Sequence, residues 1–165
     1  MTNFQLVSAC GLYCGSCSIY LATQENDTEK LLQYALVLNQ PLNETLCDGC
    51  RAERKSAHCS KMCLFIKCTF EKGIGFCGAC PDFPCNKLKD FQSKMPHRIE
   101  ILESQKRLIE IGWENWLVEM KSKFSCPACD TLNSAYHIEC RNCGRTPGCH
   151  FVSKHKELIE KYLLE

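Results

Sequence analysis

The sequence has no excess of one charge and no long apolar run. Lys and Arg number 20 against 19 Asp and Glu, for a net charge of +1. This balance favours neither a polyanion-binding protein nor a disordered acidic chain. The longest apolar runs are short, such as Leu36-Val37-Leu38, and cannot cross a bilayer. We therefore expect no membrane partner.

A secretory leader and the common catalytic patterns are missing as well. Residues 1–10 contain no Lys or Arg and no apolar stretch of useful length, so we expect a cytoplasmic protein. The chain has no Ser/His/Asp order, no paired carboxylates and no H-E-x-x-H pattern. No residue is predicted to be catalytic, and we lean toward a protein that is not an enzyme.

Apolar residues other than cysteine are scarce, and cysteine is abundant instead. Of 165 residues, 16 are cysteine, which is several-fold above ordinary usage. The other apolar residues make up about 35% of the chain, which is thin for one large core. Because the cytoplasm keeps thiols reduced, dense cysteine pairs there indicate metal ligands rather than disulfides.

Five cysteine pairs have the C-x2-C spacing, with which one tight turn directs two sulfurs at one ion. The clearest set consists of Cys126, Cys129, Cys140 and Cys143. The gap between these pairs suffices for a hairpin, and Gly144 suits the turn that follows, so we predict a zinc ribbon. Redox C-x-x-C motifs are the alternative, but they need a thioredoxin-like βαβ unit that the sequence lacks.

The first 93 residues contain eleven further cysteines, whose grouping stays open. Eleven is one short of three four-ligand sites, and His58 is the candidate for the twelfth ligand. Two sites with three spare thiols is the other interpretation. In all we expect three or four Zn²⁺ ions, while thiolate-only sets also suit an iron–sulfur cluster. The predicted N-terminal ligands are Cys10, Cys14, Cys17, Cys47, Cys50, His58, Cys59, Cys63, Cys68, Cys77, Cys80 and Cys85.

Two other motifs match known patterns without their context. The spacing Cys10-x3-Cys14-x2-Cys17 is that of radical-SAM enzymes, which also need a barrel of roughly 200 residues. Residues 73–78 spell G-x-G-x-x-G, but no βαβ unit surrounds them, so we interpret them as a link between ligands.

Two basic patches could contact nucleic acid phosphates. Residues 51–72 hold six Lys or Arg against two Glu, and a weaker patch comprises Arg141, Arg145, Lys154 and Lys156. Cations beside thiolate-rich sites also balance local charge, and we favour this interpretation because the whole chain is nearly neutral. For Cys149 and His150 we favour a spare buried thiol and a surface histidine over a substitute ligand or a reactive site.

Helical spacing dominates outside the cysteine pairs. We predict helices over 18–22, 29–38 and 64–70, one that starts at 86, and one over 153–164. The stretch 95–120 has apolar residues at helical steps, with Pro96 in its first turn and Gly112 as a break. The predicted fold is small, metal-stabilised and mostly α with minor β. Its parts are a cysteine-rich helical domain (1–93), a helical connector (94–122), a zinc ribbon (123–152) and a C-terminal helix (153–165).

The first half of the chain contains an ordered series of motifs, namely Cys10-Gly-Leu-Tyr-Cys14-Gly-Ser-Cys17, Cys47-x-Gly-Cys50, Cys63-x2-Ile66-Lys-Cys68 and Cys77-x2-Cys80-Pro-Asp-Phe-Pro-Cys85. Over roughly residues 6–92 this series resembles the bacterial and archaeal "domain of unknown function 3795" family. The resemblance implies a small, cysteine-rich, zinc-binding cytoplasmic protein with no assigned activity.

Together these patterns predict a zinc-binding protein that acts as a binding or adaptor module for an unknown protein partner. A nucleic-acid-binding zinc protein, using residues 51–72, is one alternative. An iron–sulfur redox protein or enzyme is the other.

Overall fold

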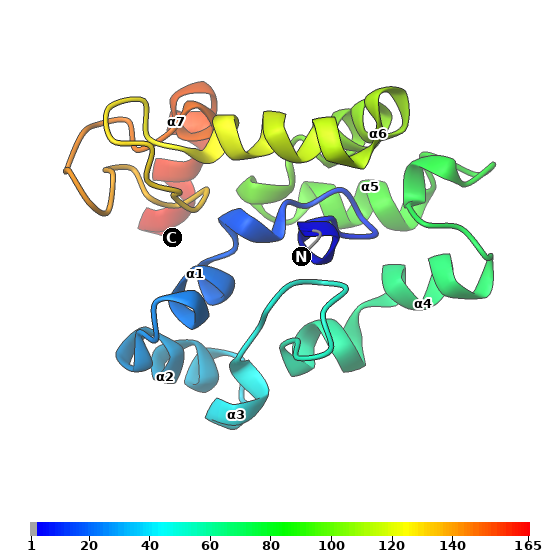
Figure 1. The fold of residues 1–165 in the computed structure, drawn as a ribbon, viewed down its shortest axis with the longest axis horizontal. Coiled ribbons are helices and arrows are strands. Elements are labelled where there is room, and N and C mark those ends of the chain that lie inside the picture. Colours follow the sequence, from blue (N-terminus) through cyan, green and yellow to red (C-terminus); the bar gives the residue numbers. More distant parts are fainter. Residues whose placement is uncertain (1–2) are drawn as a thin grey trace.

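The computed structural model describes residues 3–165, which form short helices joined by cysteine-bearing turns (Figure 1). The prediction of a mostly helical chain is confirmed. Within residues 3–165 there is no strand, and backbone pairing between extended segments is limited to two isolated bridges, Val7 with Tyr13 and Ser125 with Leu132. The predicted minor β content is therefore not found. No helix in the same residues is both long and apolar enough to span a membrane.

The first elements are short because turns and polar residues interrupt them. They are two 3-10 helices, Asn3–Leu6 and Cys14–Ser16, and three α-helices, α1 (Ser18–Gln24), α2 (Thr28–Val37) and α3 (Leu42–Thr45). Asp27 caps α2 by accepting a hydrogen bond of 3.1 Å from the Lys30 N–H, as expected for a helix after an Asx residue. The helix predicted over 29–38 is therefore confirmed.

The middle of the chain alternates turns with two-turn helices. It holds a π-helix at His58–Met62, α4 (Leu64–Glu71), a 3-10 helix at Cys77–Ala79, and α5 (Asn86–Ser93). Gly73, with φ of 64°, follows α4, and a glycine adopts this left-handed conformation at little cost. The helix predicted over 64–70 is confirmed, whereas the π-helix was not predicted.

Two longer helices complete the chain. After a 3-10 turn at Pro96–Arg98, α6 (Ile101–Phe124) runs to the C-terminal cysteines, and α7 (His150–Leu164) follows them. Gly112 (φ 77°, ψ 161°) bends α6 into two helical parts, as predicted. The last helix starts three residues before the predicted position, at His150, directly after the buried Cys149.

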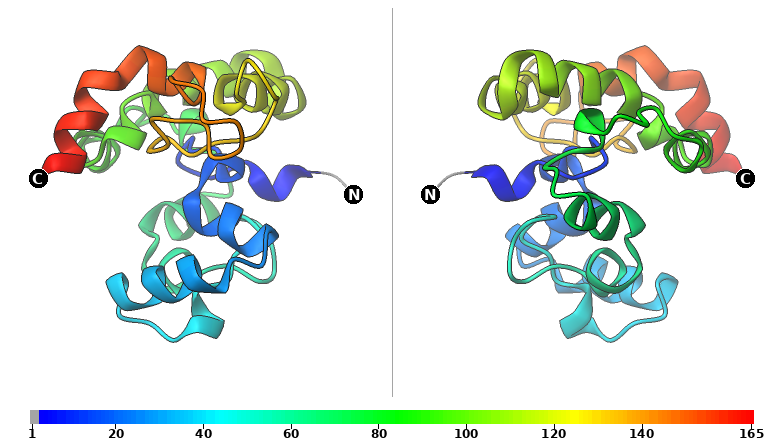
Figure 2. Two further views of the ribbon diagram at one scale, coloured as in Figure 1. Left: turned by 90° about the vertical axis from the view of Figure 1, so that its left-hand side faces the viewer. Right: turned by 90° about the vertical axis from the view of Figure 1, so that its right-hand side faces the viewer.

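The N-terminal segment lies between two layers of helices and touches both. Figure 2 shows it between the layer of α6 and α7 and the layer of α2 and α3. Above it Tyr13 packs edge-on against the buried Trp116 of α6. Gln105, also buried in α6, donates to the Ala9 carbonyl oxygen (2.8 Å) and accepts from the Gly78 N–H (2.7 Å). These contacts place the N-terminal cysteines next to those of residues 77–85.

Candidate metal centre

Four cysteines of the C-terminal segment come together after α6. Their sulfurs all lie within 4.8 Å of one another. The Sγ atoms of Cys126 and Cys143 are 3.7 Å apart, and those of Cys129 and Cys140 are 3.6 Å apart. Cys126 and Cys140 are buried, Cys143 is exposed, and Cys129 lies between these extremes. The predicted grouping of these four residues is what the structure contains.

Two similar turns position the four sulfurs. The N–H of Asp130 donates to the Cys126 carbonyl oxygen (2.9 Å), and the N–H of Gly144 donates to the Cys140 carbonyl oxygen (2.9 Å). Asp130 and Gly144 each have a positive φ, 55° and 71°, a conformation that Gly and Asp adopt more readily than most residues. Each C-x2-C pair therefore closes in one tight turn, as the sequence predicted for Gly144.

Backbone pairing in the C-terminal segment is short, and a buried asparagine adds to it. The N–H of Cys126 donates to the Thr131 carbonyl oxygen (2.9 Å), and the N–H of Asn133 donates to the Phe124 carbonyl oxygen (2.8 Å). Asn133 is fully buried, and its side-chain amide donates to the carbonyl oxygens of Thr131 (2.9 Å) and Gly148 (3.0 Å). Its Oδ1 accepts from the Arg141 N–H (3.1 Å). The group of four thiols is confirmed, whereas the strands of the predicted zinc ribbon are not found in residues 3–165, and sequence patterns do not reveal the role of Asn133.

The thiols are close enough to influence one another's protonation. A hydrogen bond with the Thr131 hydroxyl, assisted by the Thr131 N–H, lowers the pKa of Cys129 to about 6. The Arg145 N–H alone would lower the pKa of Cys143, but the sulfurs of Cys129, Cys126 and Cys140 outweigh it and raise that pKa to about 11. Four sulfurs at this spacing cannot all be anionic without a compensating cation. A divalent ion that prefers four thiolates, such as Zn²⁺, fits this donor set.

The eleven N-terminal cysteines are less tightly gathered. Within residues 3–165 no second set of three candidate ligand atoms lies within 4.8 Å of one another, and no cysteine is disulfide-bonded. The N–H of Cys50 donates to the sulfur of Cys14 (3.3 Å). Around Cys10 pack Cys63, Cys77 and Cys85. His58 is exposed at the start of the π-helix.

The cations of residues 51–72 are largely engaged within the molecule. Lys61 pairs with Glu44 (2.8 Å), Arg54 with Asp48 (2.7 Å) and Lys72 with Asp82 (2.6 Å). Lys72 Nζ also lies 3.2 Å from the Cys80 sulfur. The guanidinium of Arg51 stacks over the rings of Phe4 and Phe76.

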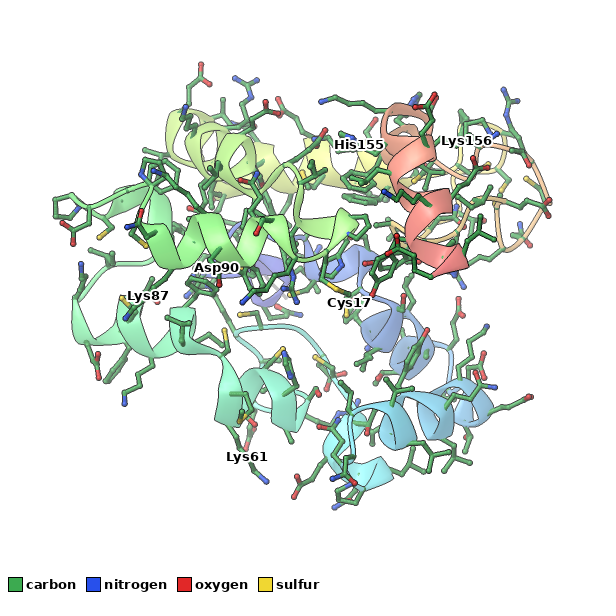
Figure 3. All side chains as sticks on the ribbon, turned by 180° about the vertical axis from the view of Figure 1, so that it is seen from behind. Cys17, Lys61, Lys87, Asp90, His155 and Lys156 are labelled. Carbon is green, nitrogen blue, oxygen red and sulfur yellow. The ribbon has the colours of Figure 1, made fainter. Side chains whose placement is uncertain are left out.

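A charged cluster that the sequence patterns did not indicate ties α6 to α7. The carboxylate of Glu100 accepts hydrogen bonds from Lys123 (2.7 Å), Lys154 (2.7 Å) and His155 (2.8 Å). Figure 3 shows His155 on α7. Burial alone would raise the pKa of Glu100, but these three hydrogen bonds outweigh it and lower the pKa to about 2. No local pattern could have found the cluster, because its members lie 23 to 55 residues from Glu100.

The fold and the thiol cluster define a class: a small helical protein, rich in cysteine, with a set of four neighbouring thiols near its C-terminus. The family model described as "Protein of unknown function (DUF3795)" matches residues 6–90, just over half of the chain. The chain belongs to this family, which confirms the resemblance noted above. No curated protein and no solved structure matches it. The matched part holds all eleven N-terminal cysteines, and the C-terminal set lies outside it.

Proposed function

We propose that this chain is a zinc-binding protein in which metal ions hold short helices and turns together. The observation that carries the proposal is the set of four sulfurs within 4.8 Å of one another in the C-terminal segment. Structural zinc sites of this kind are tetrahedral and often use four thiolates. Hydrogen bonds within the two turns and from the buried Asn133 support the arrangement of these four sulfurs.

We include the N-terminal cysteines in this proposal, for a total of three or four ions. They support it by their number and by their placement where the N-terminal segment meets the loops of residues 47–63 and 77–85. Each structural zinc can contribute on the order of 10 kcal/mol to folding, which would add to the apolar cluster around Cys10.

Binding of a protein partner is the second part of the proposal. A closed four-thiolate site leaves no coordination position for a substrate, which favours a binding or adaptor module over an enzyme. Leu36 and Val37 on the outer face of α2 are each 82% exposed. Neighbouring exposed apolar side chains of this size are typical of protein contact surfaces.

Two alternatives have less support. A nucleic-acid interface over residues 51–72 would need free cations, but Lys61, Arg54 and Lys72 already pair with carboxylates of the same chain. An iron–sulfur cluster suits the same thiolate ligands. Visible absorption near ~400 nm after anaerobic purification would favour it over zinc.

The proposal is tested by the metal content of anaerobically purified protein. We expect zinc in the native chain and the loss of one ion per chain in Cys126→Ser and in Cys140→Ser. Cys149→Ser is the matched control, because Cys149 is equally buried and follows the same segment but lies outside the set. If Cys126→Ser retained the full zinc content of the native chain, the C-terminal site would not be a zinc site.

A further inference from the structure

The two C-x2-C pairs nearest the N-terminus meet in space, although 29 residues separate them in the sequence. We propose that Cys14, Cys17, Cys47 and Cys50 form a second metal centre, which takes one Zn²⁺ ion. The inference rests on the proposed zinc-binding function and adds to it a ligand set in the part of the chain that defines the family.

The first pair sits on a preformed turn. Residues Cys14–Ser16 form a 3-10 helix, and the Cys17 N–H donates to the Cys14 carbonyl oxygen (2.9 Å). Cys17 lies at the start of α1, as Figure 3 shows. The first pair therefore lies on one tight turn, as the C-x2-C spacing of a metal site requires.

The second pair is held against the first by hydrogen bonds. The Cys50 N–H donates to the Cys14 sulfur (3.3 Å). The Cys47 N–H donates to the hydroxyl of Thr23 in α1 (3.1 Å), the helix that begins directly after Cys17. Both members of the second pair are therefore fixed beside the element that carries the first pair.

Gly49 allows the loop that carries the second pair to lie close to the N-terminal segment. Its φ is 124°, and a Cβ atom there would lie 2.4 Å from the Gln5 carbonyl oxygen. Only glycine fits a position with this conformation and this close a backbone neighbour. The Arg51 N–H then donates to the same Gln5 oxygen (3.3 Å), so the loop of residues 47–51 is tied to the N-terminal segment on both sides of Cys50.

Cys10 belongs to a different neighbourhood. It is buried in a cluster with Cys63, Cys77 and Cys85, next to Leu88. The Cys77 N–H donates to the carbonyl oxygen of Ala9 (2.9 Å), on the side of the chain that faces Gln105. Cys14 packs against the other apolar cluster, so we group it with Cys17, Cys47 and Cys50 rather than with Cys10.

The proposed ligands are more open than the C-terminal four. In residues 3–165 the C-terminal set alone has ligand atoms that all lie within 4.8 Å of one another. The sulfurs of the proposed ligands do not meet this limit. One ion shared by the two pairs would join the loop of residues 47–50 to the turn of residues 14–17, and so would fix this loop to the start of α1.

Metal counts in single and double variants of the full chain test the shared ligand set. We expect Cys14→Ser and Cys47→Ser each to lose one zinc per chain, and the double variant to lose the same single ion. By contrast, Cys14→Ser combined with Cys126→Ser should lose two ions. Two ions lost from the Cys14/Cys47 double variant, or none from either single variant, would overturn the inference.

A second measurement avoids substitutions that could prevent folding. Native protein is alkylated under increasing chelator concentration, and each cysteine is followed by mass spectrometry. We expect Cys14, Cys17, Cys47 and Cys50 to become reactive together. Reactivity of residues 14 and 17 at one chelator concentration and of residues 47 and 50 at another would contradict a shared ion. If Cys126→Ser lost zinc in the metal counts while the alkylation contradicted a shared ion, the proposed function would still hold and only this inference would fail.

Discussion

At the scale of single residues, a few buried polar side chains form hydrogen bonds with backbone groups outside regular secondary structure. Gln105 links α6 to the Ala9 carbonyl oxygen and the Gly78 N–H, and Asn133 satisfies three backbone groups around the C-terminal cysteines. A buried backbone group without a partner costs about 1–3 kcal/mol. These two side chains therefore help to hold the cysteine-bearing turns in place.

Glu100 leads to a prediction about pH. Its pKa of about 2, below the ordinary 4.5, means that the charged form stabilises the fold at neutral pH. This contribution is lost as the pH falls from about 4.5 toward 2. We expect Glu100→Gln to lower the free energy of unfolding by about 1–3 kcal/mol at pH 7, with the difference from the native chain shrinking below pH 4.5. Urea unfolding at several pH values measures both quantities.

The matched control for this change is Glu119→Gln. Glu119 also bonds a cation, Arg107 (2.6 Å), but both side chains are 44% exposed. An exposed ion pair contributes less than about 1 kcal/mol. Equal effects of the two substitutions at pH 7 would show that burial of Glu100 does not strengthen its interactions.

At the scale of elements, the bend in α6 allows both parts of the helix to bury side chains in the core. Before the bend Leu108 and Gln105 are buried, and after it Trp116, Met120 and Phe124 are buried. Gly112 sits between them at φ 77° and ψ 161°, a region that side chains other than glycine occupy only at a cost of about 1–3 kcal/mol.

We therefore expect Gly112→Ala to destabilise the protein by about 1–3 kcal/mol, measured by chemical denaturation. Gly75→Ala is the control, because Gly75 has no positive φ and no heavy atom would lie within 4 Å of its added Cβ. It should change stability by less than about 0.5 kcal/mol or increase it slightly. A Gly112→Ala variant as stable as the native chain would mean that the bend is not imposed by the glycine.

The helices were predictable where a residue that caps, ends or bends a helix stands close to it in the sequence. Asp27 before α2, Gly73 after α4 and Gly112 inside α6 act within a few residues of the structure that they shape. The C-terminal four-thiol set was predictable for the same reason, since two close pairs span only residues 126–143. Local patterns thus account for most of the helices and for one site.

The rest depends on contacts between distant residues. The hydrogen bond from the Asn133 side chain to Gly148 spans 15 residues. The meeting of Cys14 with Cys50 spans 36 residues, and the link from Gln105 to Ala9 spans 96. Spacing alone therefore left the grouping of the eleven N-terminal cysteines open.

At the scale of the whole molecule, cysteine side chains lie where the layers of helices meet. Apolar packing forms two modest clusters, and cysteines line the turns that join them. A domain of this size is stable by about 5–15 kcal/mol, which is comparable to what a single structural zinc contributes. The fold as a whole should thus depend on its metal ions.

The most direct test of this dependence is the helical circular dichroism of the full chain during thermal unfolding, with and without a strong chelator under reducing conditions. We predict that metal removal abolishes the cooperative transition and most of the helical signal, first in the N-terminal half. An unchanged spectrum and an unchanged melting temperature after complete removal of metal would contradict the account.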